Sequence, residues 1–193
     1  MCITPSLHLL QFTFTYYSAS FYISVPYILC MKGQSALFSS VKNNSKGASD
    51  DWETPDDLFN ILNNEFRFTL DACASPNNHK VDDYYSLNYD GLKQEWKDHI
   101  VWINPPYSNV KDWVSKAIDQ YDKYGITVVM LLPSRTGNKE WHELISVYAS
   151  QIRFLRGRLK FKGSHNSAPF DSAIVIFSPK TYNERVVFVN YRS

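Results

Sequence analysis

Glycine and cysteine are both scarce in this chain of 193 residues, which holds seven glycines and three cysteines. The glycines form no Gly-x-Gly-x-x-Gly run, so the sequence does not support a dinucleotide-binding fingerprint. The cysteines, at positions 2, 30 and 73, have neither metal-ligand nor disulfide spacing, and they suit a reducing cytosol. We therefore expect no metal site and no disulfide framework.

Charge is nearly balanced overall and is absent from the N-terminal stretch. The formal net charge of +1 gives no global signal for nucleic acid, and residues 1–31 contain no Asp, Glu, Lys or Arg. A secretory signal normally begins with positive charge, which this stretch lacks, and its many Ser, Thr, Tyr and Gln residues make it a weak candidate for a membrane helix. We interpret residues 1–30 as an atypical extension that need not be native, residues 31–49 as a flexible polar linker, and residues 50–193 as one folded domain without a membrane segment.

The most informative motif follows an apolar stretch at residues 100–103, which predicts a buried strand. It consists of Asn104, Pro105, Pro106 and Tyr107. The two prolines stiffen the turn and leave its carbonyl groups free to accept hydrogen bonds, while Asn104 adds an acceptor and Tyr107 a flat stacking face. Such a turn suits a planar exocyclic amino group, as on adenine or cytosine. The alternative is a rigid strand end that binds no ligand.

The segments after this motif alternate between helix and strand. Residues 110–118 carry apolar side chains at helical spacing, and residues 126–132 form an apolar, β-branched run that ends at Pro133. A further apolar strand is expected at residues 173–177. This alternation predicts an α/β fold with a parallel sheet. Ligands of such sheets bind beyond the carboxyl ends of the strands, where the Asn-Pro-Pro-Tyr turn would lie.

A second candidate site lies upstream, where a predicted strand at residues 66–70 runs into Asp71 and then small residues. Small side chains let the backbone approach a ligand closely, and a carboxylate can bind a cation or a hydroxyl group. An ordinary loop explains the same residues equally well. Further upstream, Thr54 can cap a helix that has Pro55 at its first position, which is a purely structural role.

Six short motifs follow one another along the chain. They are Trp52-x-Thr54-Pro55, Asp71-Ala72-Cys73-Ala74, Asp90-Gly91-Leu92, Asn104-Pro105-Pro106-Tyr107, Gly157-Arg158-Leu159-Lys160-Phe161 and Ala168-Pro169-Phe170. Over about residues 49–179, this series resembles the phage and prophage DNA N6-adenine methyltransferases of the Dam type. The resemblance implies a Rossmann-like methyltransferase fold with a mostly parallel central sheet flanked by helices. It also implies S-adenosyl-L-methionine as methyl donor and DNA as substrate, in the cytoplasm of a bacterial host.

By that resemblance, the donor pocket is bordered by residues of the first three motifs, namely Trp52, Thr54, Pro55, Asp71, Ala72, Cys73 and Asp90. The chain departs from most methyltransferases because Asp-Ala-Cys-Ala replaces their glycine-rich first motif. Asp82, Asp83 and Asp90 compete for the ribose or adenine of the donor, and we prefer Asp90 because Gly91 follows it in a turn. The Asn-Pro-Pro-Tyr turn would hold the target adenine.

The expected chemistry is an in-line displacement, in which positioning supplies much of the acceleration. Hydrogen bonds from the amine to Asn104 and to a carbonyl such as that of Pro105 would stabilise the positive charge that develops on nitrogen. No general base is obligatory, and the target base must leave the duplex and stack, on Tyr107 in our interpretation. Two alternatives stay open: a cytosine-N4 methyltransferase, and a DNA-binding module of the same fold that has lost catalysis.

A local basic patch is the expected DNA-binding surface. No acidic residue lies between Glu143 and Asp171, and this interval contains Arg153, Arg156, Arg158, Lys160 and Lys162. These cations could follow a phosphate backbone, or they could simply be solvated side chains. Arg135, in the loop after the strand at residues 126–132, is a further candidate for DNA contact. The sequence indicates neither the oligomeric state nor the recognition sequence.

Overall fold

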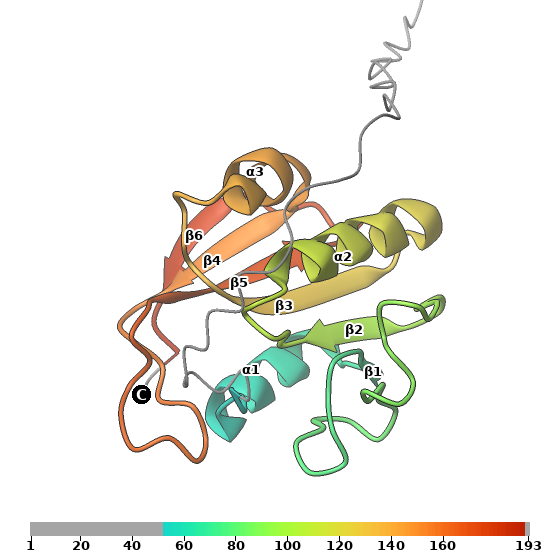
Figure 1. Ribbon diagram of the computed structural model, residues 1–193. Helices are drawn as coiled ribbons and strands as arrows, with labels where there is room; N and C mark the ends of the chain where they lie inside the picture. Colours follow the sequence, from blue (N-terminus) through green and yellow to red (C-terminus); the bar gives the residue numbers. More distant parts are fainter. Residues whose placement is uncertain (1–51, 192–193) are drawn as a thin grey trace, which may run out of the picture. The chain divides into compact units, whose positions relative to one another are not determined.

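The computed structural model describes residues 52–191, which form one six-stranded sheet flanked by helices (Figure 1). The expected extension at residues 1–30 and the linker at residues 31–49 lie outside the described residues. The strands are β1 Leu70–Asp71, β2 Ile100–Ile103, β3 Thr127–Pro133, β4 Gln151–Leu155, β5 Ser172–Phe177 and β6 Val186–Val189. The helices are α1 Asp56–Phe66, α2 Val110–Tyr124, the π-helical segment η1 Glu140–Ile145 and the short α3 Ser146–Tyr148.

Five of the six strands point in the same direction. The sheet has the order β1-β2-β3-β5-β4-β6, in which β1, β2 and β3 pair in parallel and β4 pairs in parallel with β6. β5 is antiparallel to both of its neighbours, β3 and β4, so β5 alone is reversed. The predicted α/β fold with a mostly parallel sheet is therefore confirmed. The carboxyl ends of β1, β2, β3 and β4 meet at one edge of this sheet.

Alternation along the strands divides the core between the two faces of the sheet. In β3, Met130 packs in one apolar cluster, together with the apolar sides of α2 and η1. Its neighbour Val129 packs in the other cluster, together with the apolar side of α1. Successive side chains of a strand point to opposite faces, so a fully apolar strand can bury both of its sides. The helices thus cover both faces of the sheet, and the loops lie at the ends of its strands.

The local predictions for the central elements are confirmed. The strands expected at residues 100–103, 126–132 and 173–177 are present to within one residue at each end, as β2, β3 and β5. The helix expected at residues 110–118 continues through α2 and ends at Gly125, whose φ of 63° lies in the left-handed region that favours glycine. These elements carry the Asn-Pro-Pro-Tyr turn between β2 and α2.

β1 is shorter than the strand expected at residues 66–70. Phe66 is the last residue of α1, and Arg67 turns the chain with a φ of 60°. Only Leu70 and Asp71 pair with β2. The large alternating side chains before Leu70 therefore belong to the end of a helix and to a turn. Their spacing alone does not distinguish this arrangement from a strand.

Candidate active site

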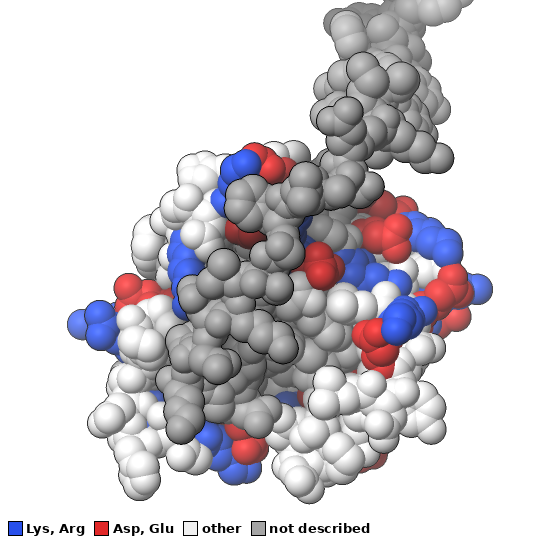
Figure 2. Space-filling view, in the orientation of Figure 1, with Lys and Arg blue, Asp and Glu red and all other residues white. Residues whose placement is uncertain are grey.

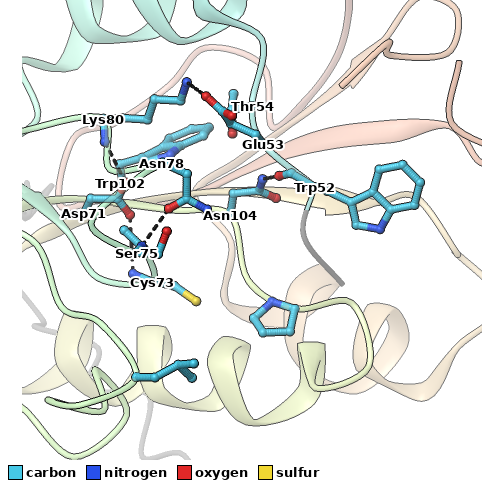
Figure 3. A pocket seen from close by; sticks show the side chains of 13 residues that line it. Trp52, Glu53, Thr54, Asp71, Cys73, Ser75, Asn78, Lys80, Trp102 and Asn104 are labelled. Atoms are coloured by element: carbon cyan, nitrogen blue, oxygen red, sulfur yellow. Dashed lines mark hydrogen bonds and ion pairs between the residues drawn. The ribbon is translucent and has the colours of Figure 1, made fainter. Parts of the chain in front are cut away.

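A cavity of about 140 Å³ lies at the carboxyl ends of β1 and β2 (Figure 3). Its walls contain seven residues of the motifs singled out in the sequence, which are Trp52, Thr54, Asp71, Cys73, Ala74, Asn104 and Pro106. They come from the segment before α1, the end of β1 with the loop that follows it, and the turn after β2. The fold thus joins motifs that lie up to 52 positions apart in the chain.

A second hollow, of about 300 Å³, opens beside this cavity. The two share four wall residues, which are Cys73, Ala74, Leu87 and Pro106. The second hollow also contains Ala72 and Asp90, whereas neither Asp82 nor Asp83 lines the cavity or the hollow. The carboxylate of Asp90 forms an ion pair of 2.9 Å with Lys93. Of the three competing aspartates, Asp90 is therefore the one that lies beside this space.

Gly91 sets how closely the loop before β2 approaches β1. A Cβ atom at this position would lie 2.1 Å from the carbonyl oxygen of Ala72 and 3.1 Å from the ring of Trp113. The indole N–H of the fully buried Trp96 donates to the carbonyl of Gly91 at 3.0 Å and holds the loop in place. Glycine is needed here for close backbone approach, which is a stricter requirement than the turn expected from the sequence.

Asp71 is buried at the end of β1, with 3% of its surface exposed. Its carboxylate accepts hydrogen bonds from the backbone N–H groups of Lys80, at 3.1 Å, and Cys73, at 3.4 Å. Burial raises the pKa of this carboxyl to about 6, against the opposing effect of the two N–H donors. Asp71 therefore organises the loop that follows β1 as well as lining the cavity.

Asn104 is held at both ends of its side-chain amide. The NH2 group donates to the backbone carbonyl of Trp52 (Figure 3). The amide oxygen accepts a hydrogen bond of 3.1 Å from the hydroxyl of Tyr107. The first bond connects the Asn-Pro-Pro-Tyr turn to the segment before α1. The two bonds fix the rotation of the amide before any substrate is present, which is what preorganisation requires.

Tyr107, expected to offer a stacking face, is largely enclosed, with 8% of its surface exposed. Its ring meets Phe170 and Phe161 edge-on, at centroid distances of 5.3 and 6.3 Å. Burial raises the pKa of the hydroxyl well above its usual range, so it stays protonated and can donate to Asn104. The remaining side of the residue lines a separate cavity of about 340 Å³, which also contains Arg135.

Thr54 and the three prolines near the site differ in whether they line the 140 Å³ cavity. Thr54 is buried in the cavity wall with 2% of its surface exposed. Pro55 occupies the position before α1 and no side chain caps this helix, so the capping role suggested for Thr54 is wrong. Pro55 lines a different cavity, of about 490 Å³. Pro106 lines both the cavity and the hollow, whereas Pro105 is buried and lines neither.

Two lysines and two carboxylates form a network that the sequence did not indicate. Lys80, whose side chain is only 8% exposed, lies 2.7 Å from Asp56 and 3.3 Å from Glu53. Lys162 lies 3.0 Å from Glu53 and 3.3 Å from Asp56. Glu53 and Lys80 also line the 140 Å³ cavity. The four residues join the loop after β1, the start of α1 and the loop before β5, and no local pattern relates segments so far apart.

Arg153 does not belong to the expected basic patch. Its side chain is buried, and its guanidinium group forms two hydrogen bonds of 2.6 Å with the carboxylate of Glu65 in α1. The hydroxyl of Tyr191 accepts a third bond at 2.9 Å. The expectation that all five cations share one DNA-facing surface is therefore wrong for Arg153, which pairs with a carboxylate distant in the sequence.

The remaining predicted DNA contacts are exposed; they are Arg135, Arg156, Arg158, Lys160 and Lys162. Arg156 and Lys160 line the cavity of about 490 Å³ with Pro55. Arg158 lies 3.9 Å from Asp171, and Lys162 belongs to the charge network already described. In the face shown in Figure 2, cationic and anionic side chains lie interspersed over the described surface. Some cations of the interval that lacks acidic residues are thus paired in the folded protein with carboxylates from other segments.

Among residues 52–191, no cluster of three or more His, Cys, Asp or Glu side chains is arranged to hold a metal ion. Within the same part of the chain, no helix has both the length and the apolar character needed to cross a membrane.

Comparisons with known proteins connect this geometry to one family. The family model described as DNA N-6-adenine-methyltransferase (Dam) matches residues 41–193. A protein of Haemophilus phage HP1 (strain HP1c1) named DNA N-6-adenine-methyltransferase is 32% identical over 148 residues, which cover 72% of this chain and 84% of that protein. A protein of the same name from Escherichia phage T1 is 36% identical over 94 residues, covering 48% of this chain and 39% of that protein.

One solved structure is also similar, that of the Type IIL restriction-modification enzyme MmeI in complex with DNA. It is 15% identical with a TM-score of 0.39, over 69% of this chain and 23% of that chain. The family model matches most of the chain, and the phage HP1 protein is similar over most of its own length. These two findings establish the family. The chain belongs to the DNA N-6-adenine-methyltransferase (Dam) family.

Proposed function

We propose that this protein transfers a methyl group from S-adenosyl-L-methionine to the N6 atom of an adenine in DNA. The observation that carries the proposal is the position of Asn104, whose amide lies in the cavity wall between Trp52 and Tyr107. Membership of the DNA N-6-adenine-methyltransferase family supports adenine as the target. The phage origin of the similar proteins fits an activity in the cytoplasm of a bacterial host.

The cavity and the adjoining hollow suit a donor that joins a nucleoside to an amino acid. Ligand sites commonly occupy about 300–1,000 Å³, so such a donor needs the hollow of about 300 Å³ as well as the cavity of about 140 Å³. Carboxylates attract the positive charges of a sulfonium and an ammonium group, and the apolar walls suit a ring. We assign donor binding to Trp52, Thr54, Asp71, Ala72, Cys73 and Asp90, with Pro55 setting the start of α1 beside them. When bound, the donor supplies an electrophilic methyl group on a positively charged sulfur.

Asn104 can bind the target amine without giving up its contacts within the protein. An amide oxygen has two lone pairs, and the hydroxyl of Tyr107 uses one of them. The other is available to an N–H of adenine. This bond strengthens as positive charge develops on the nitrogen, so it favours the transition state over the ground state.

Access of adenine to Asn104 requires the base to leave the DNA duplex. Trp52, Tyr107, Phe161 and Phe170 form an aromatic cluster next to Asn104, with ring centroids 5.0–6.3 Å apart for the contacting pairs. Aromatic rings supply flat, apolar contact surface for an unstacked base. We assign stacking of the base to Tyr107, through the small part of its ring that stays exposed.

The proposal is tested by identifying the product. Purified protein is incubated with unmethylated DNA and S-adenosylmethionine carrying a labelled methyl group, and the DNA is then digested to nucleosides. We expect the label in N6-methyladenine. Label in N4-methylcytosine would establish the cytosine alternative instead. Unlabelled DNA from a protein that binds the donor and DNA in calorimetry would identify a binding module without catalysis.

A further inference from the structure

The cavity of about 340 Å³ lies between two loops at the carboxyl edge of the sheet. One loop follows β2 and leads into α2, and the other follows β3 and leads into η1. The cavity shares only Asn109 with the 300 Å³ hollow and no residue with the 140 Å³ cavity. It is therefore a separate space next to the proposed donor site.

Tyr107 connects this cavity to the catalytic turn. One side of the residue lines the cavity, while its hydroxyl donates to the amide oxygen of Asn104 at 3.1 Å. A nucleotide whose base reaches Asn104 thus has its own backbone close to this space. The walls are largely polar, and they contain Asn109, Lys111, Arg135, Asn138 and Glu140 among others.

The charges in this cavity favour an anion. Lys111 and Arg135 are exposed wall residues, and neither forms an ion pair with a carboxylate of residues 52–191. Glu140 is the single acidic residue among the walls. The guanidinium carbon of Arg135 lies 5.7 Å from the centre of the Phe170 ring, a cation–π contact that favours this position of the guanidinium group. By contrast, Lys162 is neutralised by Glu53 and Asp56.

We infer that this cavity binds a backbone phosphate of DNA beside the target adenine, through Lys111 and Arg135. The inference rests on the proposed function, because it takes DNA as the substrate. A phosphate contact sets the register of the strand and carries no information about bases. Lys111 and Arg135 therefore hold the strand that delivers the base, and they do not choose the sequence that is methylated.

The test compares Lys111→Gln and Arg135→Gln with Lys97→Gln. Lys97 is exposed and precedes β2, so it loses the same charge at the opposite edge of the sheet. DNA binding is measured by fluorescence anisotropy over a series of salt concentrations, which needs no turnover. We expect each cavity variant to weaken binding about tenfold and to reduce the slope of log affinity against log salt by about 0.9, the value for one phosphate contact.

Donor affinity, measured by calorimetry, should be unchanged in all three variants, and Lys97→Gln should bind DNA as the wild type does. Salt slopes equal to that of Lys97→Gln in both cavity variants would overturn the inference. An altered sequence context of methylated sites would overturn it as well, since that would indicate base reading. The binding measurement distinguishes failure of this inference from failure of the proposed function. If only the proposed function fails, methyl transfer is absent while the variants still change the salt dependence of DNA binding.

Discussion

At the scale of single residues, Asp71 is a buried carboxyl group whose ionisation opposes folding. Burial raises its pKa from the ordinary value of 3.8 to about 6. Because the pKa of Asp71 is higher in the folded protein than in the unfolded chain, the folded protein binds more protons than the unfolded chain at pH values between these two pKa values. The contribution of Asp71 to the free energy of unfolding therefore decreases as pH rises from about 4 to about 6. The total change is about 3 kcal/mol, at about 1.4 kcal/mol for each pH unit that separates the two pKa values.

Asp71→Asn removes this titration and keeps a side chain of similar shape. We expect the unfolding free energy of the wild type, minus that of the variant, to fall by about 3 kcal/mol between about pH 4 and pH 6. Above about pH 7 the difference should be level, because Asp71 is then ionised in both states. Urea denaturation at a series of pH values measures it. A difference independent of pH would show that burial does not perturb this carboxyl.

Asn104 is the residue on which the proposed chemistry depends most directly. Asn104→Ala removes a hydrogen bond that strengthens in the transition state, so kcat should fall on the order of 10²-fold or more. Affinity for S-adenosylmethionine should change little, and single-turnover methylation together with calorimetry separates the two effects. Asn60→Ala, which removes an exposed amide from α1, is the matched control and should leave both unchanged. Near-normal turnover of Asn104→Ala would refute the mechanism.

At the scale of elements, the loop between β1 and β2 is fitted to β1 at Gly91. An added Cβ would lie 2.1 Å from the carbonyl oxygen of Ala72, and a backbone atom cannot move away as a flexible side chain can. Gly91→Ala should therefore displace the loop and cost about 1–3 kcal/mol or more of unfolding free energy. Donor affinity should fall with it, because Gly91 and Asp90 line the 300 Å³ hollow.

Gly137→Ala is the control for this prediction. A Cβ at Gly137 would have no atom within 4 Å, so its unfolding free energy should stay within about 0.5 kcal/mol of the wild type. Thermal or urea denaturation compares the two variants, and calorimetry gives their donor affinities. Equal stability and equal donor affinity in both would show that the loop is not tightly fitted to β1.

At the scale of the whole molecule, Arg153 and Glu65 join β4 to α1 across 88 positions of sequence. Tyr191, near the end of the described residues, contacts the same guanidinium group. Glu65→Gln leaves a buried cation without its charged partner, so we expect a loss of about 1.5–3 kcal/mol. Glu95→Gln breaks the fully exposed pair with Lys123, which solvent screens, and should leave the unfolding free energy nearly unchanged. Similar losses in both variants, measured by urea denaturation, would contradict a special role for the buried pair.

Much of the fold follows from patterns within short segments. The strands β2, β3 and β5 and the helix α2 are readable because apolar side chains recur at the period of the element that buries them. The boundary at Phe66 is not readable in this way, because a run of large residues fits a helix end as well as a strand. The resemblance to the Dam-type family also correctly indicated membership, since it rests on the order of several motifs.

The sequence by itself determined the strand–turn–helix unit that presents Asn104 and Tyr107, because stiff prolines and local periodicity act within about ten residues of the turn. Only the tertiary structure decided which atoms those side chains meet. The carbonyl of Trp52 reaches Asn104 from 52 positions away, and Phe170 encloses Tyr107 after the whole sheet has formed. The physical reason is that periodicity records whether a side chain is buried, whereas its partner is chosen by the packing of distant segments around one edge of the sheet.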